Sequence, residues 1–276
     1  MQQINCLNLC EILPYLLTKK KILESLLDAK IVAQFKTCER IYIGSSFCGK
    51  YFIQQLDSDL KEVFGLCKEK NIKVTLVIPT FSERDLELGK KRISQIVEFG
   101  ADDVDEITVN DYGMLFYVRE NYGLVMNLGR LIMKDYRDPR YDNYFQIPWR
   151  PKMFTNHLRT IIKDYKIKSI EMDITHKNMN FAEVPDDIIV GIHVPYCYQT
   201  VGRICEYASI TKEIVNKFRV NDACEGNCAE SIVKYLDSDE NMEYIRYGRT
   251  IYFKHPGYEL SGLDKYRLIY FPLPLQ

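Results

Sequence analysis

The sequence predicts an α/β fold, a TIM-barrel-like and possibly distorted parallel β/α barrel formed as a single domain by residues 1–276. Short apolar runs of strand length alternate with longer amphipathic patterns of helix length, which is typical of βαβ units and a parallel sheet. About seven such units follow one another, and no Gly-, Ser- or Pro-rich linker separates them. A barrel accommodates this many units better than an open sheet.

The elements follow in order along the chain. The predicted strands are short runs rich in branched aliphatic residues: Arg40–Gly44, Ile72–Pro79, Ile107–Asn110, Gly123–Leu128, Ser169–Ile174, Ile188–Pro195 and Tyr244–Phe253. The predicted helices repeat apolar residues at helical spacing: Ser58–Lys70, Glu83–Phe99, Asp111–Arg119, Thr155–Tyr165 and Thr211–Phe218. Ser82 precedes acidic residues at the start of one helix, and Asn110 or Asp111 is expected to cap the next.

Composition narrows the class of protein. Hydrophobic residues make up 46% of the chain, which is enough for a substantial core, and 37 basic residues balance 38 acidic ones. This balance gives no electrostatic reason to expect nucleic acid as a partner. The segment Met1–Leu17 has no basic region and contains Glu11 and Pro14, so it does not resemble a secretory signal. No apolar run approaches the roughly 20 residues of a membrane span. We therefore expect a cytoplasmic protein.

The cysteines carry the most chemical information. Cys224 and Cys228 form a C-x3-C pair in a polar, turn-like segment, and Cys205 lies upstream of them. Thiols grouped in this way, in a chain without a secretory signal, favour a metal centre over a disulfide. In a β/α barrel, chemistry gathers at the C-terminal ends of the strands. Cys48 and Cys197 each lie just past a predicted strand, and Cys205 is eight residues further on, so all three are expected near that rim.

Three interpretations of these cysteines remain open from spacing alone. An iron–sulfur cluster uses soft thiolates, usually four of them. A structural zinc ion also takes four ligands, but these usually come as two close pairs, and only one close pair is present here. The third interpretation is buried cysteine without a ligand. We expect it for the cysteines in apolar or helical contexts, which are Cys6, Cys10, Cys38 and Cys67.

A longer stretch then resembles a known family. The segment from His193 through Cys197 to Gly202-Arg203-Ile204-Cys205 is similar to the signature of the collagenase-like peptidase family U-32, with Ile204 inserted before the last cysteine. Other matching stretches are Glu39–Lys50, Val109–Gly113 and Ile170–Met172. The Glu39–Lys50 stretch is similar to the short, UbiV-like members of that family, which act in oxygen-independent ubiquinone biosynthesis.

The resemblance implies a TIM-barrel-like fold that carries a 4Fe–4S cluster. Transferred residue by residue, its ligands would be Cys48, Cys205, Cys224 and Cys228, with Cys197 in reserve because of the inserted Ile204. The resemblance also implies a heterodimer with a homologous subunit.

Three polar residues are candidates for catalysis: Glu171, His193 and Arg203. His193 lies in the family-like motif, and Glu171 on a core-like strand would need a partner such as Arg203 or Lys177. His176 is a further candidate proton carrier or ligand, although a lone histidine is more often a packed or surface residue. Arg130 and the stretch Arg137–Arg140 could bind an anionic substrate at the rim of the barrel, or could simply be solvated.

Two classes of function compete. The first is an iron–sulfur protein that takes part in an oxygen-independent hydroxylation or a related modification with a partner subunit. The second is a peptidase-like hydrolase or peptide-modifying enzyme whose metal site is structural, and a non-catalytic scaffold subunit is a further alternative. The substrate would be a small molecule or a peptide. The sequence contains no HExxH motif and no recognisable serine–histidine–acid arrangement.

Overall fold

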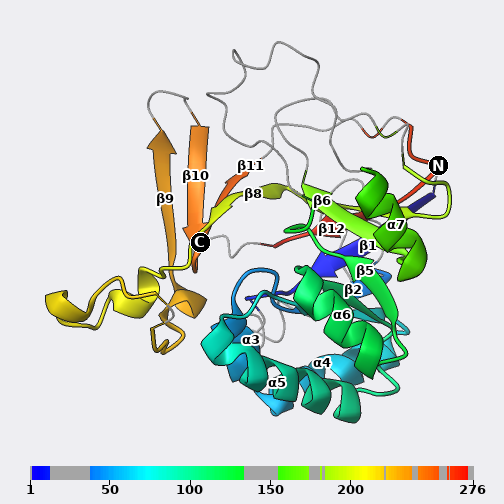
Figure 1. The fold of residues 1–276 in the computed structure, drawn as a ribbon. Helices are drawn as coiled ribbons and strands as arrows, with labels where there is room; N and C mark the ends of the chain where they lie inside the picture. Colours follow the sequence, from blue (N-terminus) through cyan, green and yellow to red (C-terminus); the bar gives the residue numbers. More distant parts are fainter. Residues whose placement is uncertain are drawn as a thin grey trace.

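A computed structural model describes residues 2–12, 38–133, 155–173, 181, 184–220, 222–237, 242–254, 260 and 262–272. Its centre is a closed barrel of eight parallel strands in the order β1-β12-β7-β6-β5-β4-β3-β2 (Figure 1). The strands are β1 (Gln2–Asn8), β2 (Arg40–Gly44), β3 (Lys73–Ile78), β4 (Glu106–Val109), β5 (Val125–Leu128), β6 (Ser169–Asp173), β7 (Ile189–Val194) and β12 (Lys265–Tyr270). The prediction of a TIM-barrel-like fold is therefore confirmed.

The first and last strands close this barrel. β1 pairs in parallel with β12 from Gln2 opposite Lys265 to Leu7 opposite Tyr270, and β1 also pairs with β2. Neither β1 nor β12 was among the predicted strands. The six other barrel strands all fall on predicted apolar runs.

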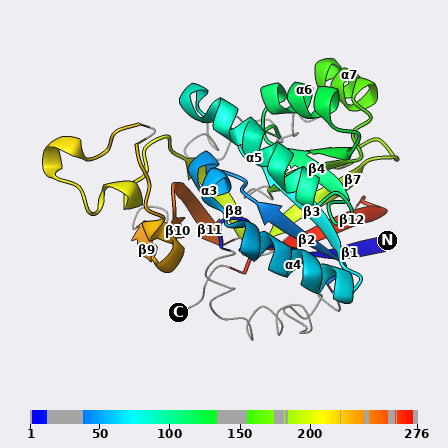
Figure 2. The same ribbon diagram turned by 90° about the horizontal axis from the view of Figure 1, so that it is seen from below.

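Helices cover the outside of the barrel (Figure 2). They are α3 (Gly49–Gln54), α4 (Asp57–Glu69), α5 (Leu86–Phe99), α6 (Tyr112–Asn121) and α7 (Asn156–Asp164). Four lie on predicted helices, and a short 3-10 turn, η1 (Glu83–Asp85), leads into α5. The side chain of Asp111 accepts the Met114 N–H, at 2.7 Å, which confirms it as the cap of α6. Ser82, by contrast, makes no capping hydrogen bond and donates to Asp85.

A second, antiparallel sheet lies beside the barrel. Its order is β8-β11-β10-β9, with β8 (Tyr196–Val201), β9 (Ile232–Asp237), β10 (Met242–Tyr247) and β11 (Thr250–Lys254). The single strand predicted over Tyr244–Phe253 is in fact the β10–β11 hairpin, because the chain reverses at Gly248 with φ +57°.

The helix predicted over Thr211–Phe218 is wrong. This stretch contains only the 3-10 turn η5 (Ile214–Asn216), whose apolar residues have no surface to pack against. Further 3-10 turns are η4 (Tyr207–Ser209) and η6 (Asn227–Glu230). Tertiary packing stabilises most protein helices, and Ile214 and Val215 lack it.

The main core lies between the barrel strands and the helices, whereas the barrel interior mixes apolar and charged residues. Inside the barrel, Arg267 pairs with Glu106, and Arg40 lies 3.3 Å from the same carboxylate. Buried charges of this kind need such partners. The cysteines predicted to be core residues, Cys6, Cys10, Cys38 and Cys67, are all buried and unbridged.

No helix in the described ranges has both the length and the apolar character that crossing a membrane would require.

Candidate metal centre

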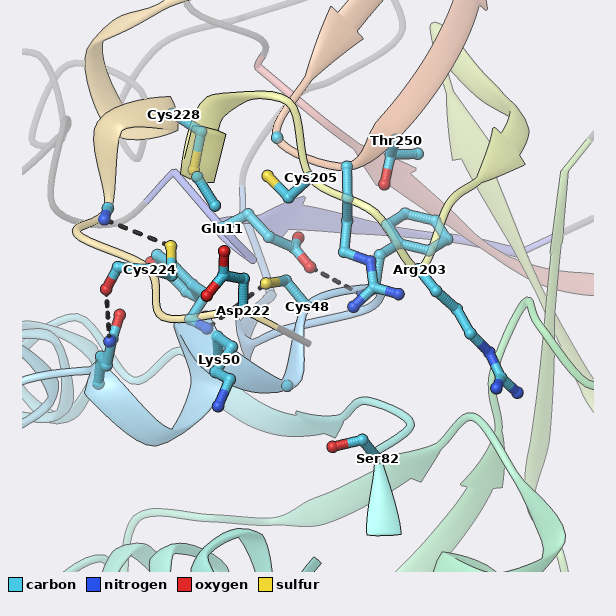
Figure 3. Close-up of a pocket in the computed structure, with 18 of the residues that line it drawn as sticks. Glu11, Cys48, Lys50, Ser82, Arg203, Cys205, Asp222, Cys224, Cys228 and Thr250 are labelled. Atoms are coloured by element: carbon cyan, nitrogen blue, oxygen red, sulfur yellow. Dashed lines mark hydrogen bonds between the residues drawn. The ribbon is translucent and has the colours of Figure 1, made fainter. Parts of the chain in front are cut away.

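Four thiols line one cavity between the rim of the barrel and the small sheet (Figure 3). They are Cys48, Cys205, Cys224 and Cys228, the four residues predicted as ligands. All four are partly buried, and none forms a disulfide. They come from the loop after β2, the segment after β8 and the turn before β9, so the fold assembles them from distant parts of the sequence.

Cys48 is held by the turn that leaves β2. Gly44 has φ +101°, and a Cβ at this position would lie 2.3 Å from the carbonyl oxygen of Val77, so a side chain cannot fit. The Ser45 hydroxyl accepts the Cys48 N–H at 2.8 Å. Cys48 then caps α3, and its sulfur accepts the Tyr51 N–H at 3.5 Å. The thiol is thus fixed at the C-terminal rim of the barrel.

Cys224 and Cys228 are separated by a tight turn. Gly226, between them, has φ +79°, and its N–H donates to the Cys224 sulfur at 3.4 Å. The Gln54 amide donates to the Cys224 carbonyl at 2.9 Å, which fastens this turn to the end of α3. On the other side, Gly248 of the β10–β11 hairpin faces Cys228, and a Cβ there would lie 3.8 Å from its sulfur.

Cys205 follows β8 by a short turn. The Arg249 Nε donates to the Gly202 carbonyl at 2.5 Å, which ties this turn to the β10–β11 hairpin. The Ser209 hydroxyl donates to the Cys205 carbonyl at 3.4 Å. Arg203, a predicted catalytic candidate, lies at the edge of the cavity, is exposed, and its side chain extends away from the four sulfurs (Figure 3).

Burial keeps two of these thiols protonated in the absence of a cation. It raises the pKa of Cys48 to about 11 and that of Cys228 to about 12. The neighbouring thiols Cys48, Cys224 and Cys205 raise the pKa of Cys228 further, while Arg249 acts in the opposite direction on Cys48. A bound metal ion reverses this balance, because coordinated thiols lose their protons.

Glu11 is a functional candidate that the sequence reasoning missed. Its carboxylate lines the same cavity and accepts the Ser45 hydroxyl at 2.5 Å and the Phe47 N–H at 2.9 Å. Burial raises the pKa of Glu11 above its usual value. Recognising β1 as the first barrel strand would have revealed it, because Glu11 follows the end of that strand.

Cys197, the predicted reserve ligand, lies outside the cavity that the four other thiols line. It lies on β8, is fully buried, and packs with Tyr244 and Phe253 in a separate core cluster. It packs as one of the core residues of the small sheet.

Glu171 and His193 meet inside the barrel and also lie outside this cavity. Their Oε2 and Nε2 atoms are 3.1 Å apart, and Thr108 donates to the other carboxylate oxygen at 2.6 Å. Burial lowers the pKa of His193, so its ring is neutral near pH 7. The prediction that Arg203 is the partner of Glu171 is therefore wrong. The other predicted partner, Lys177, and the candidate His176 lie outside the described residues.

Arg130 is neither a rim residue open to anions nor a solvated one, so both interpretations offered for it are wrong. It is fully buried, and its guanidinium pairs with the Asp173 carboxylate while lying over the rings of Phe47 and Tyr198. An arginine already neutralised in the interior is not available to a ligand. The stretch Arg137–Arg140 lies outside the described residues.

The donor set fits a thiolate-bound metal centre in its chemistry. In the described ranges, no three His, Cys, Asp or Glu side chains lie close enough, as placed, to share one metal ion. The four sulfurs nevertheless line a common cavity, and two of them accept backbone N–H groups, as metal-bound thiolates do. No known protein-family model matches the chain, and a search of curated proteins finds no significant match.

Proposed function

We propose that this chain is an iron–sulfur protein whose 4Fe–4S cluster is held by Cys48, Cys205, Cys224 and Cys228. The observation that carries the proposal is that four thiols, from three separated stretches, line a single cavity. Chance burial would scatter cysteines through the core, as it does for the remaining five. Four soft ligands with no histidine among the described residues of the cavity suit iron–sulfur chemistry.

Backbone N–H groups directed at two of the sulfurs support a cluster whose reduction potential the protein adjusts. Tyr51 donates to Cys48 and Gly226 donates to Cys224, and hydrogen bonds to thiolate sulfurs are one of the ways a protein sets a cluster potential. A cluster held by four cysteines would supply electron transfer. A structural zinc ion is the competing occupant of the same four thiols.

Within this proposal, the reaction is an oxygen-independent hydroxylation or a related modification, carried out with a homologous partner subunit. The support is the sequence resemblance together with the chemistry of the cavity beside the thiols. There, Glu11 is a buried carboxyl group positioned by Ser45 and Phe47, and Arg249 adds a positive charge. These residues could orient a polar substrate and hold a proton next to the cluster.

The geometry gives less support to a cysteine-dependent hydrolase. Such an enzyme needs a thiolate beside a base, usually histidine. Burial raises the pKa of Cys48, and no described histidine lines its cavity. His193 lies inside the barrel, paired with Glu171.

The test is anaerobic purification followed by iron, sulfide and zinc analysis and a visible absorption spectrum. We expect a coloured protein with iron and acid-labile sulfide in equal amounts. Alanine variants of Cys48, Cys205, Cys224 and Cys228 should each lose most of the iron. The control is Cys197→Ala, which removes a fully buried thiol outside the cavity and should retain the cluster.

Two results would overturn the proposal. One is a colourless protein with a single zinc ion and no sulfide, which would leave a structural zinc site. The other is iron binding that survives in the four variants and disappears in Cys197→Ala. The partner subunit is tested separately, by asking whether a homologous chain co-purifies anaerobically. If no homologous chain co-purifies, the proposed partner subunit is rejected, and the cluster proposal is unaffected.

A further inference from the structure

The connection between Cys205 and Cys224 carries an unusual surface. We call residues Ile210–Val220 the projecting loop, because in both views it extends away from the barrel and the small sheet (Figures 1 and 2). Its large apolar side chains are exposed: Ile214 by 86%, Val215 by 76%, Ile210 by 59%, Phe218 by 56% and Val220 by 52%. Single exposed apolar residues are ordinary, but five within one short loop indicate a binding surface.

The base of the projecting loop is fastened, so its shape is defined. The Ser209 hydroxyl accepts the Phe218 N–H at 2.9 Å, across the neck of the loop. The Lys212 ammonium lies 2.5 Å from the Asp222 carboxylate and donates to the Ala223 carbonyl. Phe218 has φ +58°, a left-handed conformation that costs energy for a bulky residue. These contacts hold the base of the loop in place and leave the residues at its tip exposed.

The charge of the projecting loop is positive. It contains Lys212, Lys217 and Arg219 against a single acidic residue, Glu213. Lys212 is engaged at the base, whereas Lys217 makes no ion pair with any residue that the structure describes. Cations beside exposed aliphatic side chains match a bilayer that has acyl chains beneath anionic headgroups.

We propose that the tip of the projecting loop inserts into the surface of a membrane that contains anionic lipids. The shape favours this occupant over a second protein, because a stable protein interface buries about 800 Å² on each partner, usually over a broad face. A narrow projection with five apolar side chains instead fits the shallow headgroup region. Such a contact through the loop tip would be peripheral.

The projecting loop lies next to the thiol cavity in the sequence, so a membrane contact at the loop also affects where the cavity lies. The projecting loop lies between Cys205 and Cys224, two of the four thiols, and Lys212 fastens it to the residue before Cys224. Membrane contact would therefore place the thiol cavity close to the lipid surface. The proposal does not depend on which metal the thiols bind.

The test is co-sedimentation of the full-length protein with two kinds of vesicle: pure phosphatidylcholine, and an equal mixture with phosphatidylglycerol. We expect binding to the anionic vesicles, weakened by added salt. The double variant Ile214→Ser/Val215→Ser should bind at least roughly tenfold more weakly, because it removes the most exposed apolar side chains. Lys217→Glu should also weaken binding. Leu88→Ser, which changes an aliphatic residue 55% exposed on α5, is the control and should not.

Circular dichroism and metal content should be unchanged in the loop variants, which separates this test from the metal-centre proposal. The inference is overturned if the wild-type protein sediments with neither vesicle, or if the double variant binds as well as wild type. It is also overturned if the double variant instead abolishes a stable complex with another protein while vesicle binding is absent. That result would make the loop a protein interface.

Discussion

The buried pair Arg130–Asp173 gives the sharpest quantitative prediction. Both side chains are almost fully buried, and the Arg130 Nε donates to an Asp173 oxygen at 2.9 Å, with a second contact from Nη2 to the other oxygen. The perturbation is Arg130→Met, which preserves much of the side-chain volume and removes the charge. Asp173 is then left buried without its cation.

The size of the effect follows from these contacts. Removing one partner of a buried ion pair costs about 3–5 kcal/mol. The guanidinium also lies 5.2 Å from the ring centroid of Phe47 and 5.3 Å from that of Tyr198, and methionine cannot reproduce these cation–π contacts. The Tyr198 N–H still donates to Asp173 at 3.2 Å, which offsets part of the loss. We expect the free energy of unfolding to fall by about 4 kcal/mol.

The assay is urea denaturation of the metal-free, reduced protein, followed by circular dichroism. The double variant Arg130→Met/Asp173→Asn removes both charges and should lie within about 2 kcal/mol of wild type, far less than the sum of the single variants. The reasoning is refuted if Arg130→Met costs under about 1 kcal/mol, or if the two single losses simply add.

Three further predictions concern positions in the barrel. Gly44→Ala should lower the free energy of unfolding by at least about 2 kcal/mol in urea melts, because its Cβ would collide with the Val77 carbonyl at a positive φ; an unchanged midpoint would contradict this. Asn127→Leu should raise that free energy by about 1–2 kcal/mol, since both amide atoms are buried without a partner in the described structure; a loss of stability would contradict this. Burial lowers the pKa of His193, so the unfolded state binds more protons and stability falls as pH drops below about 6.5. Melting temperatures at neutral and mildly acidic pH should therefore differ less for His193→Gln than for wild type, and equal differences would reject the assignment.

The sequence predicts the barrel where its strands are apolar on both faces, as in Ile72–Pro79, because such runs are typical of parallel strands that are covered on both sides. β1 and β12 were not predicted from the sequence, and the reason is physical. Arg267 sits in the middle of β12, where a charge normally indicates an exposed strand, yet it points into the barrel and pairs with Glu106. A pairing between distant strands cannot be inferred from either strand alone.

The four candidate ligands were predicted by transferring the family resemblance residue by residue, because the spacing of the cysteines alone left three interpretations open. The polar residues around them could not be predicted, because their roles depend on tertiary contacts. Glu11 gains its role from Ser45 and Phe47, which lie on a different strand connection. Conversely, Glu171 and His193 were singled out as catalytic candidates, but the fold encloses them inside the barrel, away from the thiols.

The thiol cavity joins two parts of the molecule. Cys48 belongs to the barrel rim, whereas Cys205, Cys224 and Cys228 belong to the connection between β8 and β9. The Gln54–Cys224 hydrogen bond is one direct tie between these parts, and a hydrogen bond contributes only about 1 kcal/mol. Metal–thiolate bonding contributes far more, and its free energy becomes folding free energy wherever the site is not preformed. Occupation of the cavity would therefore fix the two ends of the β8–β9 connection, at Cys205 and at Cys224–Cys228, to the barrel rim at Cys48.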